Sequence, residues 1–445
     1  MIKNIDGHKK TELSIFWFRR DLRLNDNAGL YEALKNSNPI LPLFIFDTEI
    51  LGKLPDKEDK RVVFIHKVIS ELQNELIKVG SSMLVMHGSP LSVFEKILNE
   101  YTITTVYANS DYEPATIERD NLILDFLKSK GIAFNLLKDQ VIFEKSEIVK
   151  EDGSPFKIFT PYSKAWKQKL KQEKIEKFPS ENLLNNFYKT KPIQVPSLDQ
   201  IGFKNIEIIT SLPVIDKNVI LHYHETRNFP FIKGTSNLSV HLRFGTLSIR
   251  ELVRIAVDLN EQFLNELIWR EFFMMILYHN PNVAKECFKK KYNFIIWRNN
   301  EEEFEKWCSG ETGYPIVDAG MRELNETGLM HNRVRMIVAS FLTKHLLIDW
   351  RWGEAYFAEK LLDYELSSNN GNWQWSAGCG CDAAPYFRVF NPIEQIRKFD
   401  TNLLYTQKWV KNLNKPDYPT PIIEHKFARE RFLRTFKATL ENYYL

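Results

Sequence analysis

The feature that most constrains the fold is an alternation of short apolar runs and amphipathic stretches in the first third of the chain. Amphipathic stretches with helical spacing occur, for example, at 61–79 and 89–100. Strands that are apolar on both faces and alternate with helices predict a parallel, doubly wound α/β sheet. No G-x-G-x-x-G follows the first run, so the usual dinucleotide site is not expected there. The predicted strands lie at 14–18, 39–46, 82–87, 104–108 and 134–137.

The rest of the chain changes character twice. Between about 151 and 219, Lys-rich helical fragments are interrupted by Pro and polar turns, which is typical of a connector on the surface. From about 221 onward apolar residues recur at helical spacing, as in Met330, Val334 and Ile337. The sequence therefore predicts three regions: an α/β domain at 11–145, an interdomain connector at 146–219 and an all-helical domain at 220–445.

Composition limits the class of protein. A chain of 445 residues with 44% hydrophobic residues can bury a large core, which argues against disorder. No apolar run approaches the roughly 20 residues that span a bilayer, and the start MIKNIDGHKK lacks the apolar core of a signal peptide. Four cysteines do not indicate a disulfide framework in a chain of this length. We therefore expect a cytoplasmic protein with reduced thiols and no membrane partner.

The segment DYELSSNNGNWQWSAGCGCDAAPYFRVFNP at 363–392 has an unusual composition for a core segment. It combines two carboxylates, an Asn-Asn-Gly turn and two tryptophans one residue apart. Acids and amides can hydrogen-bond the polar edge of a flat heterocycle, and tryptophans can stack on its face. The segment therefore indicates a cofactor site.

Two further patterns are less specific. GTSNLS at 234–239 combines a flexible glycine with hydroxyl groups, which suits a phosphate, although such a pattern taken alone is more often a helix N-cap. Cys379 and Cys381 could suggest zinc, but zinc needs four ligands, and Cys287 and Cys308 supply no matching pair. No metal site is expected.

Helical spacing groups several polar residues. Glu266, Trp269 and Arg270 fall at i, i+3 and i+4 on one helical face. Asn332 and Met336 share another face. Such patterns also occur on purely structural amphipathic helices.

An ion pair is predicted next to the second of these faces. Arg335 lies close to the face that carries Asn332 and Met336, and we expect it to pair with Asp363. A structural salt bridge would look the same in sequence.

Several segments, in the same order along the chain, resemble the DNA photolyase/cryptochrome family, and most closely its class I cyclobutane pyrimidine dimer photolyases. They are WFRRDLRLNDN at 17–27, KGTSNLSVHLRFGTLSIREL at 233–252, NELIWREFF at 265–273, TGYPIVDAGMRELNETGLMHNRVRM at 312–336 and the 363–392 segment. The resemblance implies a Rossmann-like antenna domain and an all-helical FAD-binding domain. It also implies light-dependent repair of cyclobutane dimers in UV-damaged DNA, by electron transfer from excited reduced FAD.

The resemblance implies that FAD is bound non-covalently and is active as FADH−. Asn369 would face the flavin N5, and Glu365 stands where the family often has Asp. Trp297, Trp350 and Trp373 would form an electron-transfer chain, with Trp373 nearest the flavin. The implied FAD-binding residues are Tyr223, Thr235, Ser236, Asn237, Leu238, Ser239, Asn332, Arg335, Asp363, Glu365 and Asn369.

The same resemblance assigns the substrate side. Glu266 would hydrogen-bond the thymine carbonyls as a proton donor, because an apolar aromatic pocket would raise its pKa. Asn332 and Met336 replace two histidines that (6-4) photolyases carry four residues apart, which favours cyclobutane dimers. The implied catalytic residues are Glu266, Trp269, Asn332, Met336 and Trp375. The implied DNA-binding residues are Arg227, Glu266, Trp269, Arg270, Arg333, Arg388 and Gln395.

The resemblance leaves alternatives open. A cryptochrome-type blue-light receptor, a DASH-type single-strand-selective photolyase and a flavoprotein electron carrier share parts of the pattern. Ala115 and Thr116 occupy the places of the Asn-Glu pair found in folate-binding relatives. The antenna chromophore could therefore be a folate, a deazaflavin or a second flavin, or there could be none. We expect a monomer.

Overall fold

The computed structural model describes residues 11–35, 38–209, 212–383 and 385–442. Contacts between residues divide the chain into two compact units. Unit 1 contains the described residues of Met1–Ile142, Ile175–Pro213 and Phe244–Leu252, and unit 2 contains those of Phe143–Lys174, Val214–Arg243 and Val253–Leu445.

This division differs from the predicted domain boundaries. The segment 146–219 does not form a region of its own but is shared between the units, and 244–252 joins unit 1. The reason is visible in the hydrogen bonds: the Phe244 carbonyl accepts from Leu22 N at 3.0 Å, and the Arg250 guanidinium donates to Asp139 at 2.8 Å.

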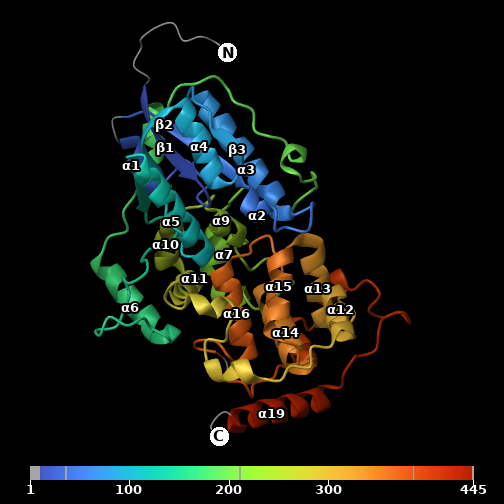
Figure 1. Cartoon of the computed structure of the whole chain (residues 1–445). Helices are drawn as coiled ribbons and strands as arrows, with labels where there is room; N and C mark the ends of the chain where they lie inside the picture. The colour runs from blue at the N-terminus through green and yellow to red at the C-terminus, as the bar shows by residue number, and fades with distance from the viewer. Residues whose placement is uncertain (1–10, 36–37, 210–211, 384, 443–445) are drawn as a thin grey trace. The chain divides into compact units, whose positions relative to one another are not determined.

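Unit 1 contains a five-stranded parallel sheet with the order β3-β2-β1-β4-β5. Strands β1, β2 and β3 are labelled in Figure 1. The strands are β1 Glu12–Phe18, β2 Ile40–Asp47, β3 Leu84–Gly88, β4 Thr102–Asn109 and β5 Ala133–Leu137. The predicted α/β class and all five predicted strands are confirmed. The expectation that every strand is buried on both faces is wrong for β3 and β5, which are partly exposed because they lie at the two edges of the sheet.

Helices cover both faces of this sheet. The helices of unit 1 are α1 Ala28–Lys35, α2 Thr48–Leu51, α3 Lys60–Lys78, α4 Pro90–Glu100 and α5 Pro114–Ser129, with short 3-10 turns at η1 Ser180–Asn186 and η2 Asp199–Ile201. Alternate residues of β1 point to opposite faces. Trp17 packs edge-on against Phe94 of α4, with ring centroids 5.3 Å apart, whereas Phe16 lies against Gly29 of α1.

A buried ion-pair network lies just after β1 and β5. Arg23 Nη2 donates to both oxygens of Asp139 at 2.8 Å, and Arg250 Nη2 donates to the same carboxylate at 2.8 Å. Burial alone would raise the pKa of Asp139, but the two guanidinium groups lower it to about 2. The carboxylate therefore stays ionised inside the unit.

Unit 2 is helical, as predicted for the second domain. Its helices are α6 Phe159–Gln172, α7 Lys217–Leu221, α8 Tyr223–Thr226, α11 Glu261–His279, α12 Glu301–Ser309, α13 Pro315–Thr327, α14 Asn332–Ser340, α15 Trp350–Lys360, α16 Leu366–Ala377, α17 Pro392–Phe399, α18 Leu404–Trp409 and α19 His425–Asn442. The division between the units falls within α9 Ser239–Phe244 and α10 Ile249–Leu259. Short turns of other helix types are η3 Pro281–Ala284, η4 Lys290–Phe294 and the π-helical η5 Phe341–His345.

Two glycines allow three helices of unit 2 to approach closely. A Cβ at Gly371 of α16 would lie 2.2 Å from the Phe273 ring of α11, and a Cβ at Gly353 of α15 would lie 2.1 Å from the Trp373 ring of α16. Larger residues would push these helices apart. Because α16 packs this closely against α11 and α15, the polar residues of α16 are held next to those of its neighbours.

The prediction of a surface connector is wrong for α6. This helix buries Tyr162 and Trp166, and Trp166 Nε1 donates to Glu271 of α11 at 2.6 Å. The lysines of α6 alternate with its apolar residues, which hides the narrow apolar face that packs on α11. Among the described helices, none is both long enough and apolar enough to cross a membrane.

Candidate functional site

A cavity of about 480 Å³ lies within unit 2, a size typical of small-molecule sites. Its walls come from α11, α14 and α16 and from the turn before α16. The predicted site residues that line it are Arg227, Ser239, Glu266, Trp269, Arg270, Asn332, Arg335, Met336, Asp363, Glu365, Asn369, Trp373 and Trp375. The structure thus brings together residues from segments more than a hundred positions apart.

Helix α11 supplies one wall. Asn260 caps its start by accepting from Phe263 N at 3.0 Å, and the helical repeat then places Glu266, Trp269 and Arg270 at the cavity, as predicted. Arg270 Nη2 donates to Glu365 Oε1 at 3.1 Å, so this ion pair joins α11 to the residue before α16.

Trp269 is held from outside the cavity by an aromatic ring that sequence reasoning missed. Phe159, the first residue of α6, stacks on Trp269 with ring centroids 3.8 Å apart and planes inclined by only 6°. Phe159 N donates to Asp382 Oδ2 at 3.0 Å, which fixes the start of α6. No local pattern in the sequence links these three residues.

Glu266 has a different environment from the expected apolar pocket. Its Oε1 forms an ion pair with Arg227 Nη1 and also accepts from Gln262 Nε2 at 2.9 Å. The expectation of a carboxyl group that donates a proton is therefore not met in this arrangement, in which Glu266 only accepts. Gln262, one turn earlier on α11, lines the cavity as well and was not anticipated.

Helix α14 supplies a second wall. Its N-terminus is capped by His331, whose Nδ1 accepts from Arg333 N at 3.1 Å. Arg335 Nη2 donates to Asp363 at 2.9 and 3.2 Å, which is the predicted ion pair. Asn332 and Met336 both line the cavity, in agreement with their predicted common face.

The amide of Asn369 is oriented by a residue that the sequence did not indicate. Asn369 Nδ2 donates to Glu354 Oε1 at 2.9 Å and to the Glu354 carbonyl at 3.1 Å. Burial raises the pKa of Glu354. Because both contacts occupy the NH₂ group, they fix which way the amide oxygen of Asn369 points.

The three predicted electron-transfer tryptophans share one hydrophobic cluster but differ in exposure. Trp373 lines the cavity and Trp350 is fully buried, whereas Trp297 is only partly buried. Trp307 is an additional, unanticipated member: it is fully buried, and its ring centroid lies 6.1 Å from that of Trp373. Its sequence context resembles ordinary core filling, so no signal could have singled it out.

Three predicted DNA-binding arginines lie near one another. Burial lowers the pKa of Arg333, and the positive charges of Arg227 and Arg388 lower it further. The Arg333 guanidinium lies 4.4 Å from the centroid of Phe399 and donates to Asn228 Oδ1 at 2.5 Å. This arrangement concentrates positive charge beside the cavity.

Several predicted site residues do not line the cavity. Of the turn at 234–239, only Ser239 does. Tyr223 packs edge-on against Phe263 and lies under the Arg227 guanidinium. The predicted residues outside the lining are Tyr223, Thr235, Ser236, Asn237, Leu238, Trp297, Trp350, Arg333, Arg388 and Gln395.

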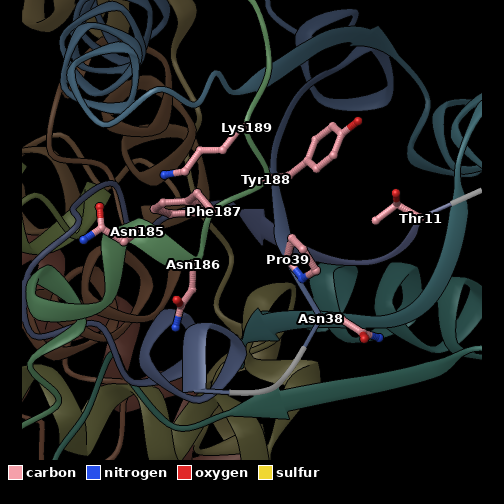
Figure 2. A pocket seen from close by; sticks show the side chains of 8 residues that line it. All are labelled: Thr11, Asn38, Pro39, Asn185, Asn186, Phe187, Tyr188 and Lys189. Carbon is pink, nitrogen blue, oxygen red and sulfur yellow. The ribbon is translucent and has the colours of Figure 1, made fainter.

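A second cavity, of about 540 Å³, lies in unit 1 and contains none of the predicted site residues. Figure 2 shows the side chains that line it, among them Thr11, Pro39 and Lys189. Thr11 precedes β1 and Pro39 precedes β2, so the cavity lies at the amino ends of these strands. Ligands of open parallel sheets bind at the carboxyl ends instead, so the cavity of unit 2 is the better candidate site.

The lining of the unit 2 cavity suits a flat, polar-edged molecule. Ala339, Phe357 and Leu361 provide apolar contacts, and Asp363 and Asn369 provide an acceptor and an oriented amide. No group of three or more His, Cys, Asp or Glu side chains that could hold a metal ion occurs in the described part of the chain.

Comparison with known proteins covers most of the chain. The family model described as DNA photolyase matches residues 14–181, and the model described as the FAD binding domain of DNA photolyase matches 263–416. A deoxyribodipyrimidine photo-lyase from Halobacterium salinarum is 34% identical, and the alignment covers 96% of this chain and 99% of that protein.

Two solved structures agree with this assignment. A class III photolyase from Agrobacterium tumefaciens has a TM-score of 0.84 at 30% identity, with coverage of 99% of this chain and 100% of the other. An archaeal photolyase from Sulfolobus tokodaii with two FAD molecules has a TM-score of 0.81 at 35% identity, with coverage of 96% and 100%. The chain therefore belongs to the DNA photolyase/cryptochrome family, and its helical part carries that family's FAD-binding domain.

Proposed function

We propose that this protein is a light-driven deoxyribodipyrimidine photo-lyase that splits cyclobutane pyrimidine dimers in DNA. The observation that carries the proposal is that one cavity gathers two sets of residues. Glu266, Trp269 and Trp375 suit a lesion, and Asp363 and Asn369 suit the polar edge of a flavin. Relatives 34% identical over nearly their full length are deoxyribodipyrimidine photo-lyases, which supports the same activity here.

The cavity residues fit FAD. The Arg335–Asp363 ion pair, the Arg270–Glu365 ion pair and the oriented Asn369 amide would hold the isoalloxazine edge. FAD, when reduced and excited by light, supplies the electron that splits the dimer. Ser239 and the hydroxyl-rich turn before it would hold the phosphates, because clustered hydroxyl and backbone N–H groups suit an anion.

The residues of this chain that surround the lesion would orient it and exclude water from it. Trp269, backed by Phe159, and Trp375 would pack against the flanks of the dimer. Glu266 would hydrogen-bond the pyrimidine carbonyls. Because Glu266 is paired with Arg227, donation to a carbonyl requires it to leave this partner and take up a proton. Asn332 and Met336 offer no acid–base group at neutral pH, which favours a cyclobutane dimer over a (6-4) product.

The arginines beside the cavity would bind DNA. Arg227 and Arg388 both repel Arg333, and phosphate oxygens would relieve this repulsion. Phosphate contacts position a duplex without reading its sequence, which suits an enzyme that acts at dimers in any context. The lesion must leave the base stack to enter the cavity, as it does in photolyases generally.

The tryptophan cluster would reduce the flavin. Trp373 borders the cavity, Trp350 is buried and Trp297 is partly exposed, so an electron from outside would move inward from Trp297 through Trp350 to Trp373. For the antenna, Ala115 and Thr116 lie in the first turn of α5 and argue against a folate. The Sulfolobus tokodaii photolyase holds two FAD molecules, which supports a flavin antenna. We also propose that the protein is cytoplasmic and acts as a monomer.

Two variants test it. Glu266→Ala should keep flavin bound but lower the repair yield of enzyme whose flavin was reduced beforehand. Trp373→Phe should repair normally when reduced beforehand but should not photoreduce its oxidised flavin. A Glu266→Ala enzyme with full repair yield would remove Glu266 from the mechanism, and a Trp373→Phe enzyme that photoreduces normally would remove Trp373 from the chain.

A further inference from the structure

One lysine of unit 2 is buried far more completely than lysines usually are. Lys344 lies in the π-helical turn η5 and is 2% exposed. Lysine is almost never fully buried unless its ammonium group is paired with an opposite charge. Among the residues that the structure describes, Lys344 forms no ion pair with a carboxylate. The fold therefore keeps a costly group in its interior, within a helix type that is frequent at functional sites.

The ammonium group is held by one backbone oxygen. Lys344 Nζ donates to the Arg388 carbonyl at 2.8 Å, which is its only hydrogen bond to a described residue. Nζ also lies 5.7 Å from the centroid of the Phe432 ring of α19. Burial lowers the pKa of Lys344 to about 7, and the positive charge of Arg388 contributes to this shift. The lysine thus interacts with both the backbone and the charge of Arg388.

Arg388 belongs to a turn whose backbone is fixed from several sides. The residue is exposed, and its N–H donates to the Pro385 carbonyl at 2.9 Å. Tyr386, in the same turn, stacks on Phe436 of α19 with ring centroids 5.9 Å apart and planes inclined by 18°. Lys344 adds the hydrogen bond to the Arg388 carbonyl. An exposed arginine is therefore presented by a turn that is anchored in the interior.

The charge of Arg388 also acts on a second predicted DNA-binding arginine. Arg388 contributes to the lowered pKa of Arg333, as it does for Lys344. Its own guanidinium group lies 5.6 Å from the centroid of the Phe390 ring. A phosphate oxygen bound at Arg388 would offset the repulsion of both neighbouring cations. An anion is therefore favoured at the residue that the buried lysine holds.

We propose that Lys344 is a positioning residue for DNA binding, which holds the Arg388 backbone so that the arginine side chain stays ready to contact a DNA phosphate. This inference rests on the proposed function, because it takes Arg388 as a contact to DNA. Lys344 itself is buried and touches neither the DNA nor the lesion.

A lysine suits this role better than a neutral donor. A hydrogen bond from an ammonium group is charge-assisted and roughly twice as strong as a neutral one. A turn that became ordered only on binding would lower the affinity for DNA, because the cost of ordering is subtracted from the binding free energy. The buried ammonium group removes that cost by fixing the turn beforehand.

The test is equilibrium binding of the full, flavin-loaded chain to duplex DNA with one thymine cyclobutane dimer, in the dark and at a series of salt concentrations. Arg388→Gln should lower the affinity about tenfold and the salt slope by about 1, because one phosphate contact is lost. Lys344→Met, which keeps an unbranched side chain without the donor, should have a similar effect. The double variant should bind no more weakly than Arg388→Gln alone. Lys437→Met, at an exposed position of α19, is the matched control and should change neither quantity.

The variants separate the possible failures. A double variant that loses the product of the two single effects would show that Lys344 acts independently of Arg388 and would overturn the inference. Unchanged affinity in Lys344→Met, beside weaker binding in Arg388→Gln, would overturn the anchor and leave Arg388 as a DNA contact. Unchanged affinity in Arg388→Gln would overturn both. A wild-type protein that neither prefers dimer-containing DNA nor repairs it would contradict the proposed function, and the inference with it.

A measurement on the wild-type protein decides the question if Lys344→Met does not bind flavin. Hydrogen exchange is followed in a peptide that contains Arg388, with and without the dimer-containing DNA. We expect the Arg388 N–H to be protected before DNA is added, because the turn is already fixed. Exchange as fast as in an unstructured peptide until DNA is added would overturn the anchor.

Discussion

Unit 1 and unit 2 both contain arginines paired with carboxylates, but in unit 2 the half-buried Arg333 lies near other arginines and forms no ion pair among the described residues. Arg23 and Arg250 converge on Asp139 in unit 1. In unit 2, Arg227 and Arg333 lie near each other, and Arg227 alone pairs with a carboxylate, Glu266, which lines the cavity. Matched charges hold a fold together, whereas surplus charge of one sign calls for a ligand of the opposite sign. The first pattern is therefore structural, and we propose that the second pattern faces DNA.

The WFRRDLRLNDN motif also belongs to the structural polar contacts of unit 1. Asn109 Nδ2 donates to Asn27 Oδ1 at 2.8 Å, and Asn27 Nδ2 donates to the Asp21 carbonyl at 3.2 Å. Arg19 and Asp120 form a further ion pair. The motif that resembles the family most clearly at the N-terminus thus builds an internal polar network, and its residues act on the fold of unit 1.

The largest predicted effect comes from breaking the matched network. Asp139→Asn leaves Arg23 buried without its counter-charge and Arg250 with Asp26 alone, so unit 1 should lose about 3–5 kcal/mol of unfolding free energy. Hydrogen exchange followed peptide by peptide measures this loss in each unit. Asp125→Asn, at an exposed position of α5 in unit 1, is the matched control. Equal protection of unit 1 in both variants would contradict the structural role.

The second prediction concerns acid. Burial, with the nearby His425 and Arg431, lowers the pKa of His345 to about 3. Because this value lies below that of an unfolded histidine, the stabilisation is fully present above about pH 6.5 and is lost as pH falls toward 3. Lowering the pH from 6.5 to 5 should cost unit 2 about 2 kcal/mol through this residue alone.

Asp139 titrates only near pH 2, so unit 1 should outlast unit 2 on acidification. Peptide-resolved hydrogen exchange at pH 7 and 5 shows which unit loses protection first. His345→Gln should flatten the response of unit 2 to pH, and an unchanged response in that variant would assign the acid sensitivity to other groups.

The third prediction addresses the unmatched charges. Arg333→Gln removes the repulsion from Arg227 and Arg388 but also the contacts with Phe399 and Asn228, so the stability of unit 2 should change little. The affinity for dimer-containing DNA should fall by about tenfold, and the salt slope of binding should fall by about 1. Arg434→Gln, at an exposed position of α19, should change neither the DNA affinity nor the salt slope. A DNA affinity equal to that of wild type would remove Arg333 from the DNA surface.

The smallest expected effect is at the aromatic stack. Phe159→Leu keeps an apolar side chain but loses the parallel contact with Trp269, so unit 2 should lose about 1 kcal/mol. Repair by pre-reduced enzyme should need more substrate for half-maximal rate, with the maximal rate nearly unchanged, because Trp269 would bind the lesion less firmly. A lower maximal rate with unchanged half-saturation would contradict a positioning role.

The sequence predicted the elements well because their signals are local. Five apolar runs became five strands, and the spacing of Glu266, Trp269 and Arg270 placed all three on one wall. It could not predict that Arg227 pairs with Glu266, because a sequence does not state which side chains meet across 39 positions.

The same limit explains the misjudged segments. Phe159 and Trp166 matter through contacts with α11, yet the many lysines around them resemble a surface linker. Glu354 orients Asn369 from a neighbouring helix, and nothing in its own surroundings marks it. These contacts arise from packing between helices that are distant in the sequence, and local sequence patterns do not report such packing.

The most direct measurement is repair of a defined thymine cyclobutane dimer in duplex DNA by purified, flavin-reduced protein, under blue light and in darkness. Our account predicts restoration of the thymines in light alone, with no net change in flavin oxidation state. Bound, photoreducible flavin with no repair in light would contradict it and would place this member of the family among the light receptors.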